Sequence, residues 1–288
     1  MPHLLIEDAL GDPRNCMTLA WASEYAYLPE EAAKVKFQAE LGMKAKLISV
    51  DNTQAYILTN EEHIVVAFRG TEGPTSIDGL KDWLLTDAVN LLIVPEGRLG
   101  TDLIAAGVGA RFHQGFVNAI DEIWAPVFEA VKAEMDACER PLWLTGHSLG
   151  GALALLAGWL FVRKMIPVQQ IYTFGGPMIG NTAAVKAIDN EFKGKIFRCV
   201  NLPDPVPRLP TMSLIANQYG HCETEILLGG VATAAENAIA VFQAMAKHAA
   251  DGIVNATIVD DIWKEVQGRL AAHNMDQYRK HLSSYKKS

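Results

Sequence analysis

The 288-residue chain has little cysteine and no concentrated positive charge. Its four cysteines, Cys16, Cys138, Cys199 and Cys222, are widely spaced and include no Cys-x-x-Cys pair. This spacing favours free buried thiols over a disulfide framework or a zinc site, and we expect neither a metal nor a cofactor. Basic residues number 25 against 33 acidic ones, so the net charge is −8. Nucleic acid is therefore not expected as a partner, and neither is binding to anionic lipid by bulk charge.

Long apolar runs are also missing. The first residues contain neither a basic stretch nor a long apolar core, so we recognise no secretory signal peptide. No unbroken apolar run approaches the length that spans a bilayer, which predicts no integral membrane segment. By default we expect a soluble cytoplasmic protein, and export by a route that leaves no such mark is compatible with the sequence.

Half of the residues are hydrophobic, which is enough for a sizeable core. Strand-like and helix-like stretches alternate, without internal repeats or a linker. Strands are expected at residues 46–51, 55–59, 63–68, 141–145, 170–175, 195–201 and 223–228, helices at 13–41, 116–138, 152–161, 182–192, 231–250, 256–272 and after 274, and irregular structure at 95–109. This alternation predicts a single α/β domain over residues 1–288, with a mostly parallel sheet and helices on both faces.

One six-residue segment suggests what the chain does. Residues 146–151 read Gly-His-Ser-Leu-Gly-Gly and lie between a predicted buried strand and a predicted helix. In that context a Gly-x-Ser-x-Gly pattern forms a nucleophile elbow. The turn is so tight that Ser148 projects into open space, and the glycines let the strand and the helix approach closely. Ser148 is therefore predicted to be a nucleophile, whereas His147 should point away from its hydroxyl.

A nucleophilic serine needs a histidine to take its proton and a carboxylate to orient that histidine. In this arrangement the acid follows a strand downstream of the serine. Asp204 meets the requirement, because it follows the strand predicted at 195–201 and is held in a stiff extended backbone by Pro203 and Pro205. Two alternatives stay open: Asp204 is an exposed residue of a proline-rich turn, or the acid is Asp189, inside a predicted helix.

Four histidines follow the candidate acid: His221, His248, His273 and His281. His248 and His281 lie beside basic residues and are expected on solvated helix faces. His273 lies between two predicted helices, and catalytic side chains concentrate in such loops. His221 is the rival, and the residues alone do not decide between the two.

Acyl transfer also needs two backbone N–H groups that face the developing negative charge. One should come from Leu149, the residue after the nucleophile, and the other from the loop after a preceding central strand. Thr71 follows the apolar strand predicted at 63–68 and is placed for this role. The alternative is that Arg69, Gly70 and Thr71 only form the turn that ends the strand.

With these residues in hand, the chain resembles the class 3 lipases, which comprise fungal triacylglycerol lipases and their bacterial and plant relatives. Five segments match this family in order along most of the chain. They are Phe-Arg-Gly-Thr at 68–71, His-Gln-Gly-Phe at 113–116, the elbow at 146–151, Thr-Phe-Gly-Gly-Pro-Met-Ile-Gly-Asn at 173–181, and Val-Asn-Leu-Pro-Asp-Pro-Val-Pro at 200–207. A single Gly-x-Ser-x-Gly arises by chance in a glycine-rich chain, whereas five ordered matches indicate relationship.

The resemblance implies the α/β-hydrolase fold and a set of site residues. They are Ser148, Asp204 and His273 as the catalytic triad, and Thr71 and Leu149 at the oxyanion hole. The family's catalytic histidine precedes a helix that carries a tyrosine a few residues on, and His273 with Tyr278 fits this position. His221 fits a separate Tyr-x-His segment that is not the catalytic one.

In fungal relatives a short amphipathic helix after the oxyanion segment covers the site and opens at a lipid surface. The resemblance implies a corresponding lid at about residues 75–95, with its apolar face expected between Thr75 and Thr86. The alternatives are an ordinary helix packed on the core, or a cap formed by the Ala-rich helical insertion at about 229–272.

The sequence thus predicts a serine-dependent carboxylic ester hydrolase that forms an acyl-enzyme. The expected partner is a lipid or ester substrate, an acylglycerol or similar fatty ester, met at a lipid–water interface. A phospholipase A1 and a non-catalytic lipid-binding protein of the same fold are the alternatives.

Overall fold

The computed structural model describes residues 5–70, 92–208, 219–222, 224–229 and 269–286. Its centre is a seven-stranded sheet in the order β1-β2-β3-β6-β7-β9-β11. The strands are β1 (Lys44–Val50), β2 (Thr53–Thr59), β3 (Ile64–Phe68), β6 (Leu142–His147), β7 (Val168–Phe174), β9 (Ile196–Asn201) and β11 (Glu225–Leu228). From β3 to β11 all neighbours are parallel, whereas β1 and β2 are antiparallel additions at one edge.

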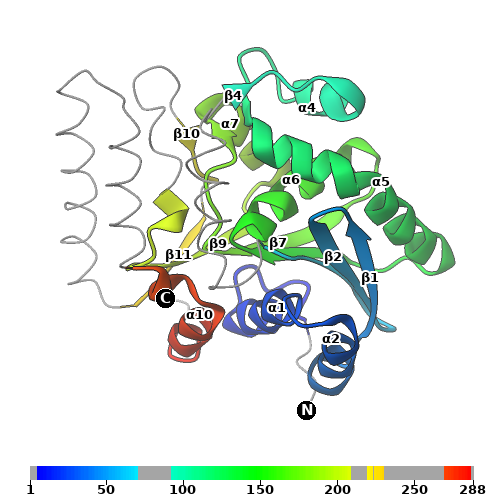
Figure 1. Ribbon diagram of the computed structural model, residues 1–288, viewed down its shortest axis with the longest axis vertical. Helices are drawn as coiled ribbons and strands as arrows, with labels where there is room; N and C mark the ends of the chain where they lie inside the picture. Colours follow the sequence, from blue (N-terminus) through cyan, green and yellow to red (C-terminus); the bar gives the residue numbers. More distant parts are fainter. Residues whose placement is uncertain (1–4, 71–91, 209–218, 223, 230–268, 287–288) are drawn as a thin grey trace.

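Helices cover both faces of this sheet (Figure 1). They are α1 (Pro13–Tyr25), α2 (Glu30–Lys36), α4 (Gly100–Ile104), α5 (Gln114–Ala137), α6 (Leu149–Arg163), α7 (Thr182–Phe192) and α10 (Met275–Leu282). One apolar cluster joins α4, α5, α6 and α7 to the sheet, and a second cluster joins α1 and α10 to the other face. The prediction of a mostly parallel sheet between helical layers is confirmed.

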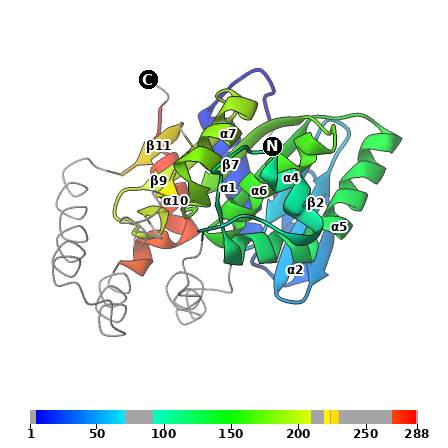
Figure 2. The same ribbon diagram turned by 90° about the horizontal axis from the view of Figure 1, so that it is seen from above.

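The central strands are buried on both faces, which explains their continuous apolar runs. In β3, Ile64, Val66 and Phe68 contribute to one cluster, whereas Val65 and Ala67 contribute to the other. Helix α6 is similarly apolar all round and nearly all of its residues are buried, because it lies between the sheet and α5. A view from above shows α6 surrounded by other elements (Figure 2).

A second, small sheet has the order β10-β8-β5-β4. Its strands are β4 (Leu92–Ile93), β5 (Phe112–His113), β8 (Gly180–Asn181) and β10 (Tyr219–Gly220). It brings together two of the family-like segments, because the backbone N–H of His113 donates to the carbonyl of Ile179 at 2.9 Å.

Two expectations from the sequence were wrong. Residues 95–109 were expected to be irregular, but they include a 3-10 turn at Gly97–Leu99 and α4, since Leu99 and Leu103 are buried in the core. Cys138 was expected to be buried, but it follows the last turn of α5 and is exposed. The other three cysteines are buried, and all four are free. Most of the lid segment (75–91) and of the Ala-rich insertion (230–268) lies outside the described residues.

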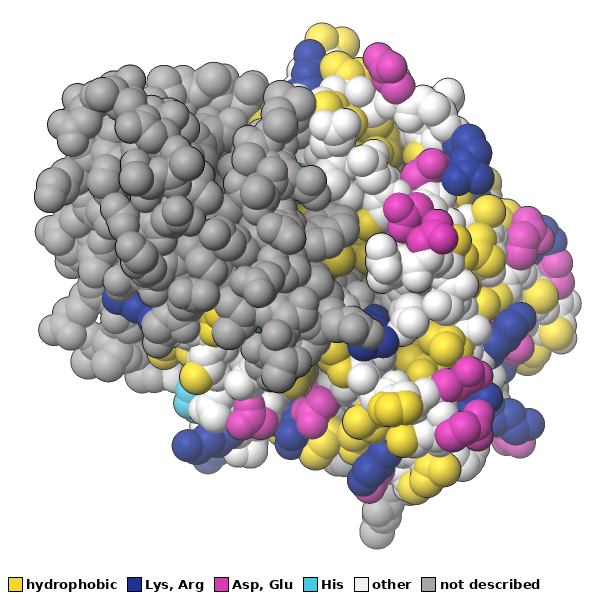
Figure 3. All heavy atoms as spheres, in the orientation of Figure 1, with side chains coloured by type: hydrophobic (Ala, Val, Ile, Leu, Met, Phe, Trp, Pro, Cys, Tyr) yellow, Lys and Arg dark blue, Asp and Glu magenta, His cyan; other side chains and the backbone are white. Residues whose placement is uncertain are grey.

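Acidic and basic side chains are interspersed over the described part of the face shown in Figure 3, without a patch of one sign. Among the helices of the described ranges, none is long and apolar enough to cross a membrane.

Candidate active site

The parallel strands end at one edge of the sheet, and their registers place the candidate residues there together. Phe68 at the end of β3 pairs with Gly146, and His147 at the end of β6 pairs with Phe174. Phe174 in turn pairs with Cys199 near the end of β9. Open α/β sheets bind ligands at this carboxyl edge, so the residues that follow these strands form the candidate site.

Ser148 lies in the turn between β6 and α6 with φ 57° and ψ −128°, a conformation that a residue with a side chain rarely adopts. Its backbone N–H donates to the carbonyl of Phe174 at 2.9 Å. The glycines of the motif are required by contact, because a Cβ on Gly146 would lie 2.1 Å from the carbonyl oxygen of Gly150. The sequence therefore builds a strained elbow, and strain of this kind is concentrated at active sites.

Leu149 is the first residue of α6, where a backbone N–H has no partner within the helix. The helix N-terminus also carries partial positive charge. Developing negative charge next to Ser148 would therefore be stabilised at this point. The second expected donor, Thr71, lies outside the described residues.

Asp204 and His273 form a buried pair, although 69 positions separate them. The Nδ1 of His273 lies 2.7 Å from Oδ2 of Asp204, and the backbone N–H of Val206 donates to Oδ1 at 2.9 Å. Only 1% of Asp204 and 7% of His273 is exposed. An ionised carboxylate only accepts hydrogen bonds, so Nδ1 carries the proton and Nε2 of a neutral His273 is the free lone pair.

Nε2 of His273 is buried and has no hydrogen-bond partner among the residues that the structure describes. Ser148 is also nearly buried, with 4% of its surface exposed. No hydrogen bond joins its Oγ to His273 within this part of the chain, and such bonds are often long before substrate binds. A buried ring nitrogen without a hydrogen-bond partner is unusual, and this one is available to accept a proton.

Two residues for which the sequence predicted no contact with Asp204 complete its environment. The hydroxyl of Tyr278, on α10, donates to Oδ2 of Asp204, and burial with the nearby carboxylate raises the pKa of Tyr278 well above its usual value. Gly175 follows β7 with φ +60°, and a Cβ there would lie 2.8 Å from Oδ2 of Asp204 and 3.0 Å from Cε1 of His273. The glycine therefore leaves room for the acid–histidine pair.

The other described candidates for the histidine and the acid have other partners or positions. His221 donates from Nε2 to the carbonyl of Pro207, and burial lowers its pKa to about 3. His281 bonds to Oδ1 of Asn201, and Asp189 lies on α7. His248 lies outside the described residues. Of the described candidates, His273 is thus the histidine that contacts Asp204.

Both ring nitrogens of His147 have hydrogen-bond partners. Its Nδ1 lies 2.8 Å from the hydroxyl of Tyr27, and its Nε2 lies 2.7 Å from the carbonyl oxygen of His273. No role for Tyr27 is predicted from the sequence, because no spacing rule connects a residue after α1 to the elbow.

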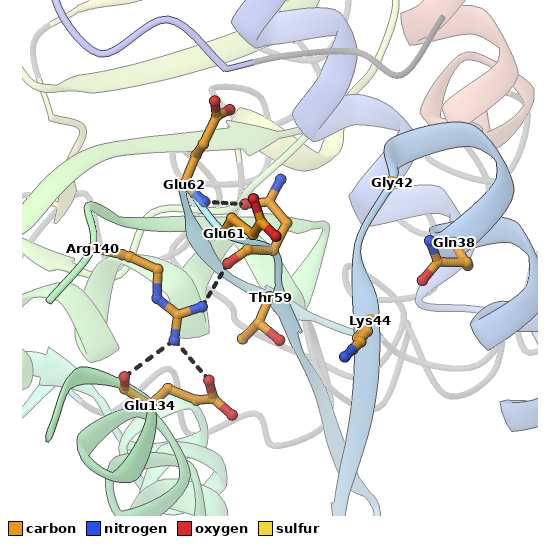
Figure 4. Close-up of a pocket in the computed structure, with 9 residues that line it drawn as sticks. Gln38, Gly42, Lys44, Thr59, Glu61, Glu62, Glu134 and Arg140 are labelled. Carbon is orange, nitrogen blue, oxygen red and sulfur yellow. Dashed lines mark hydrogen bonds and ion pairs between the residues drawn. The ribbon is translucent and has the colours of Figure 1, made fainter. Parts of the chain in front are cut away.

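Figure 4 shows the lining of a cavity of about 640 Å³. The strand registers place it at the opposite end of the sheet from Ser148. Its lining includes residues that precede β3 and β6, among them Asn60, Glu62 and Arg140. Arg140 is already held by the carbonyl of Asn60 and the carboxylate of Glu134. Within the described ranges no group of three or more His, Cys, Asp or Glu side chains is placed to hold a metal ion.

Comparison with known proteins connects this geometry to a family. The sequence profile described as "Lipase (class 3)" matches residues 65–214. A secreted mono- and diacylglycerol lipase of Fusarium solani is 33% identical over 181 residues, which cover 61% of this chain and 47% of that protein. A triacylglycerol lipase of Arabidopsis thaliana is 30% identical over 252 residues, covering 70% and 47%. The chain thus spans less than half of the length of these curated relatives.

Solved structures agree with the sequence comparison. Lipase II of Rhizopus niveus is 25% identical with a TM-score of 0.59, covering 75% of this chain and 80% of that one. The triacylglyceride lipase of Rhizomucor miehei is 23% identical with a TM-score of 0.60, covering 76% and 82%. These neighbours confirm the α/β-hydrolase fold. Because the family profile covers more than half of the chain and includes the elbow and the acid loop, the chain belongs to the class 3 lipase family.

Proposed function

We propose that this chain is a serine carboxylic ester hydrolase that cleaves acylglycerols or similar fatty esters. The observation that carries the proposal is the buried Asp204–His273 pair, whose free ring nitrogen is at the same edge of the sheet as the strained Ser148 elbow. Membership of a lipase family supports the substrate class.

In the proposed mechanism, Oγ of Ser148 attacks the ester carbonyl while Nε2 of His273 takes its proton. Asp204 holds the ring in the required tautomer and stabilises the imidazolium that forms. His273 then returns the proton to the leaving alcohol, which leaves an acyl-enzyme on Ser148. A water molecule, deprotonated by the same nitrogen, releases the fatty acid and regenerates the serine.

The tetrahedral intermediates carry negative charge on the former carbonyl oxygen. We assign its stabilisation to the N–H of Leu149 at the start of α6 and to Thr71 in the loop after β3. Loss of one such donor costs on the order of 3 kcal/mol in the barrier, so each assignment is testable by rate.

The substrate is proposed to be met at a lipid–water interface. Relatives of this chain include proteins named mono- and diacylglycerol lipase and phospholipase A(1), so the head group of the substrate is left to the assay. We further propose a single domain over residues 1–288 in which residues 75–95 form the lid and 229–272 a helical insertion.

Hydrolysis by purified protein tests this function directly. Wild-type protein should cleave a glycerol ester and Ser148→Ala should not, and His273→Ala should lose activity whereas His221→Ala retains it. The reverse result for the two histidine variants would refute the assignment of His273.

Rates on one ester below and above its solubility limit test whether the protein acts at an interface. No jump in rate across that limit would remove the lid from the proposal. A diacylglycerol and a phospholipid with the same acyl chains separate the two head groups.

A further inference from the structure

The proposed reaction requires Ser148, Asp204 and His273, which are far apart in the sequence, to meet within a few ångströms. His273 ends a short 3-10 turn, Leu270–His273, which by itself offers little to fix the ring. Two side chains hold the backbone of this turn. Asn201, at the end of β9, donates from Nδ2 to the carbonyl of Ala272 at 2.8 Å, and His147 contacts the carbonyl of His273 itself.

The bond between His147 and His273 determines the tautomer of His147. A carbonyl oxygen accepts and cannot donate, so Nε2 of His147 carries the hydrogen and donates across 2.7 Å. In the neutral ring Nδ1 is then the acceptor, and its partner at 2.8 Å is the hydroxyl of Tyr27. Burial and the neighbouring His273 lower the pKa of His147 well below its usual value, which keeps the ring neutral. The two imidazole rings are tilted against each other with centroids 4.4 Å apart.

Tyr27 extends this contact to Gly70, which follows β3 and directly precedes Thr71. A Cβ added to Gly70 would lie 2.1 Å from the hydroxyl oxygen of Tyr27 and 2.7 Å from the backbone carbonyl of His147. Gly70 therefore packs its backbone directly against the hydroxyl. Tyr27 follows α1, whose last turns also hold α10 through Glu24 and Arg279.

We propose that Tyr27 and His147 are positioning residues for this reaction. The hydrogen bonds from Tyr27 to His147 and from His147 to the carbonyl of His273 fix the general base relative to the elbow and to Gly70. The inference rests on the proposed function and deepens it, since it assigns two residues that act through His273 and do not touch the substrate. The second residue of the Gly-His-Ser-Leu-Gly segment thereby has a role of its own.

Three variants remove the hydrogen bonds of Tyr27 and His147 one after another. Tyr27→Phe deletes one hydroxyl, His147→Gln keeps an N–H that can donate to the His273 carbonyl, and His147→Phe keeps a flat ring but loses both bonds. Two controls repeat the same chemistry elsewhere: Tyr25→Phe on α1, and His63→Phe beside Trp143 at the opposite end of the sheet. Rates should be expressed per reactive serine, counted with a fluorophosphonate, so that unfolded protein does not enter the comparison.

We expect His147→Phe to lower kcat roughly tenfold or more, the size expected when a buried hydrogen bond is lost at the reacting group, with KM unchanged. His147→Gln should recover part of this loss. Tyr27→Phe should show a smaller loss, and the double variant Tyr27→Phe/His147→Phe should be no slower than His147→Phe alone, because both changes break one chain of contacts. Both controls should keep the wild-type kcat.

Equal kcat per reactive serine in His147→Phe and wild type would overturn the proposal, and so would a similar loss in His63→Phe. Fully additive effects of Tyr27→Phe and His147→Phe would show that the two residues act separately. If His147→Phe does not fold, Tyr27→Phe and His147→Gln carry the same comparison. Failure of the proposed function is seen earlier and separately, as wild-type protein without esterase activity or as Ser148→Ala with undiminished activity.

Discussion

Gly175 contacts the Asp204–His273 pair, so the variant Gly175→Ala, which adds one methyl group, tests whether the position of this pair matters for the reaction. Gly175 has φ +60°, where an alanine costs about 1–2 kcal/mol in backbone strain. The new Cβ would lie 2.8 Å from Oδ2 of Asp204 and 2.8 Å from the hydroxyl of Tyr278, both closer than real Cβ contacts allow. Either the backbone or the carboxylate must move.

The carboxylate is held by hydrogen bonds that are short and charge-assisted, among them the 2.7 Å contact with Nδ1 of His273. A hydrogen bond to a charged group contributes about 1.5–3 kcal/mol, so partial loss of this contact should raise the barrier by about 1–3 kcal/mol. Each 1.36 kcal/mol is a tenfold change in rate, which gives an expected fall in kcat of about 10- to 100-fold for Gly175→Ala.

Gly194 provides the matched control. It has φ +83°, but a Cβ there would meet nothing within 4 Å. Gly194→Ala should therefore lower the free energy of unfolding by about 1–2 kcal/mol, as backbone strain alone predicts, and leave kcat unchanged. Ester hydrolysis and urea denaturation of both variants test the reasoning. Equal kcat in Gly175→Ala and Gly194→Ala would refute it.

Three further predictions concern the Tyr278 hydroxyl, the buried His113 and the ion pair of Arg279. Tyr278→Phe, which removes a donor to Asp204, should lower kcat by roughly tenfold, measured per fluorophosphonate-reactive serine, and unchanged kcat would contradict this. Burial lowers the pKa of His113 from 6.5 to about 4, so the folded protein resists its protonation. The free energy of unfolding should thus fall by up to about 3 kcal/mol as pH drops from 6.5 to 4. Denaturation of His113→Phe should show a weaker pH dependence, and an unchanged slope would contradict the assignment. Arg279→Ala, which removes the ion pair between α10 and Glu24 on α1, should cost about 1 kcal/mol in urea denaturation, and no loss would show that the pair contributes nothing.

Much of the fold follows from local sequence. The apolar run of residues 64–68 predicts a strand buried on both faces. The helical stretch predicted at 13–41 contains α1 and α2, and α2 begins at Glu30, directly after Pro29. The short helices at 97–104 were missed, because they depend on the burial of Leu99 and Leu103 against distant parts of the core. A stretch with several glycines gives no local indication of such contacts.

The candidate site likewise includes residues that local sequence identifies and residues that only tertiary contacts bring together. Ser148 is found from its own neighbours, because the elbow requires glycines at fixed positions around it. The residues alone left His221 and His273 open, and only the family resemblance favoured His273. In the folded chain His273 contacts Asp204, whereas His221 contacts the carbonyl of Pro207. Tyr27 was not found at all, because its contact with His147 spans 120 positions and follows no spacing rule.

The central claim is that Ser148 is the activated nucleophile of this chain, and chemical trapping tests it most directly. Folded protein is treated with a fluorophosphonate, which phosphonylates an activated serine with loss of fluoride, and the adduct is located by mass spectrometry of its peptides. We predict one adduct, on Ser148, that forms at least tenfold more slowly in Asp204→Ala, since the orienting carboxylate is then lost. No adduct on folded protein, or an adduct at another residue, would contradict the account.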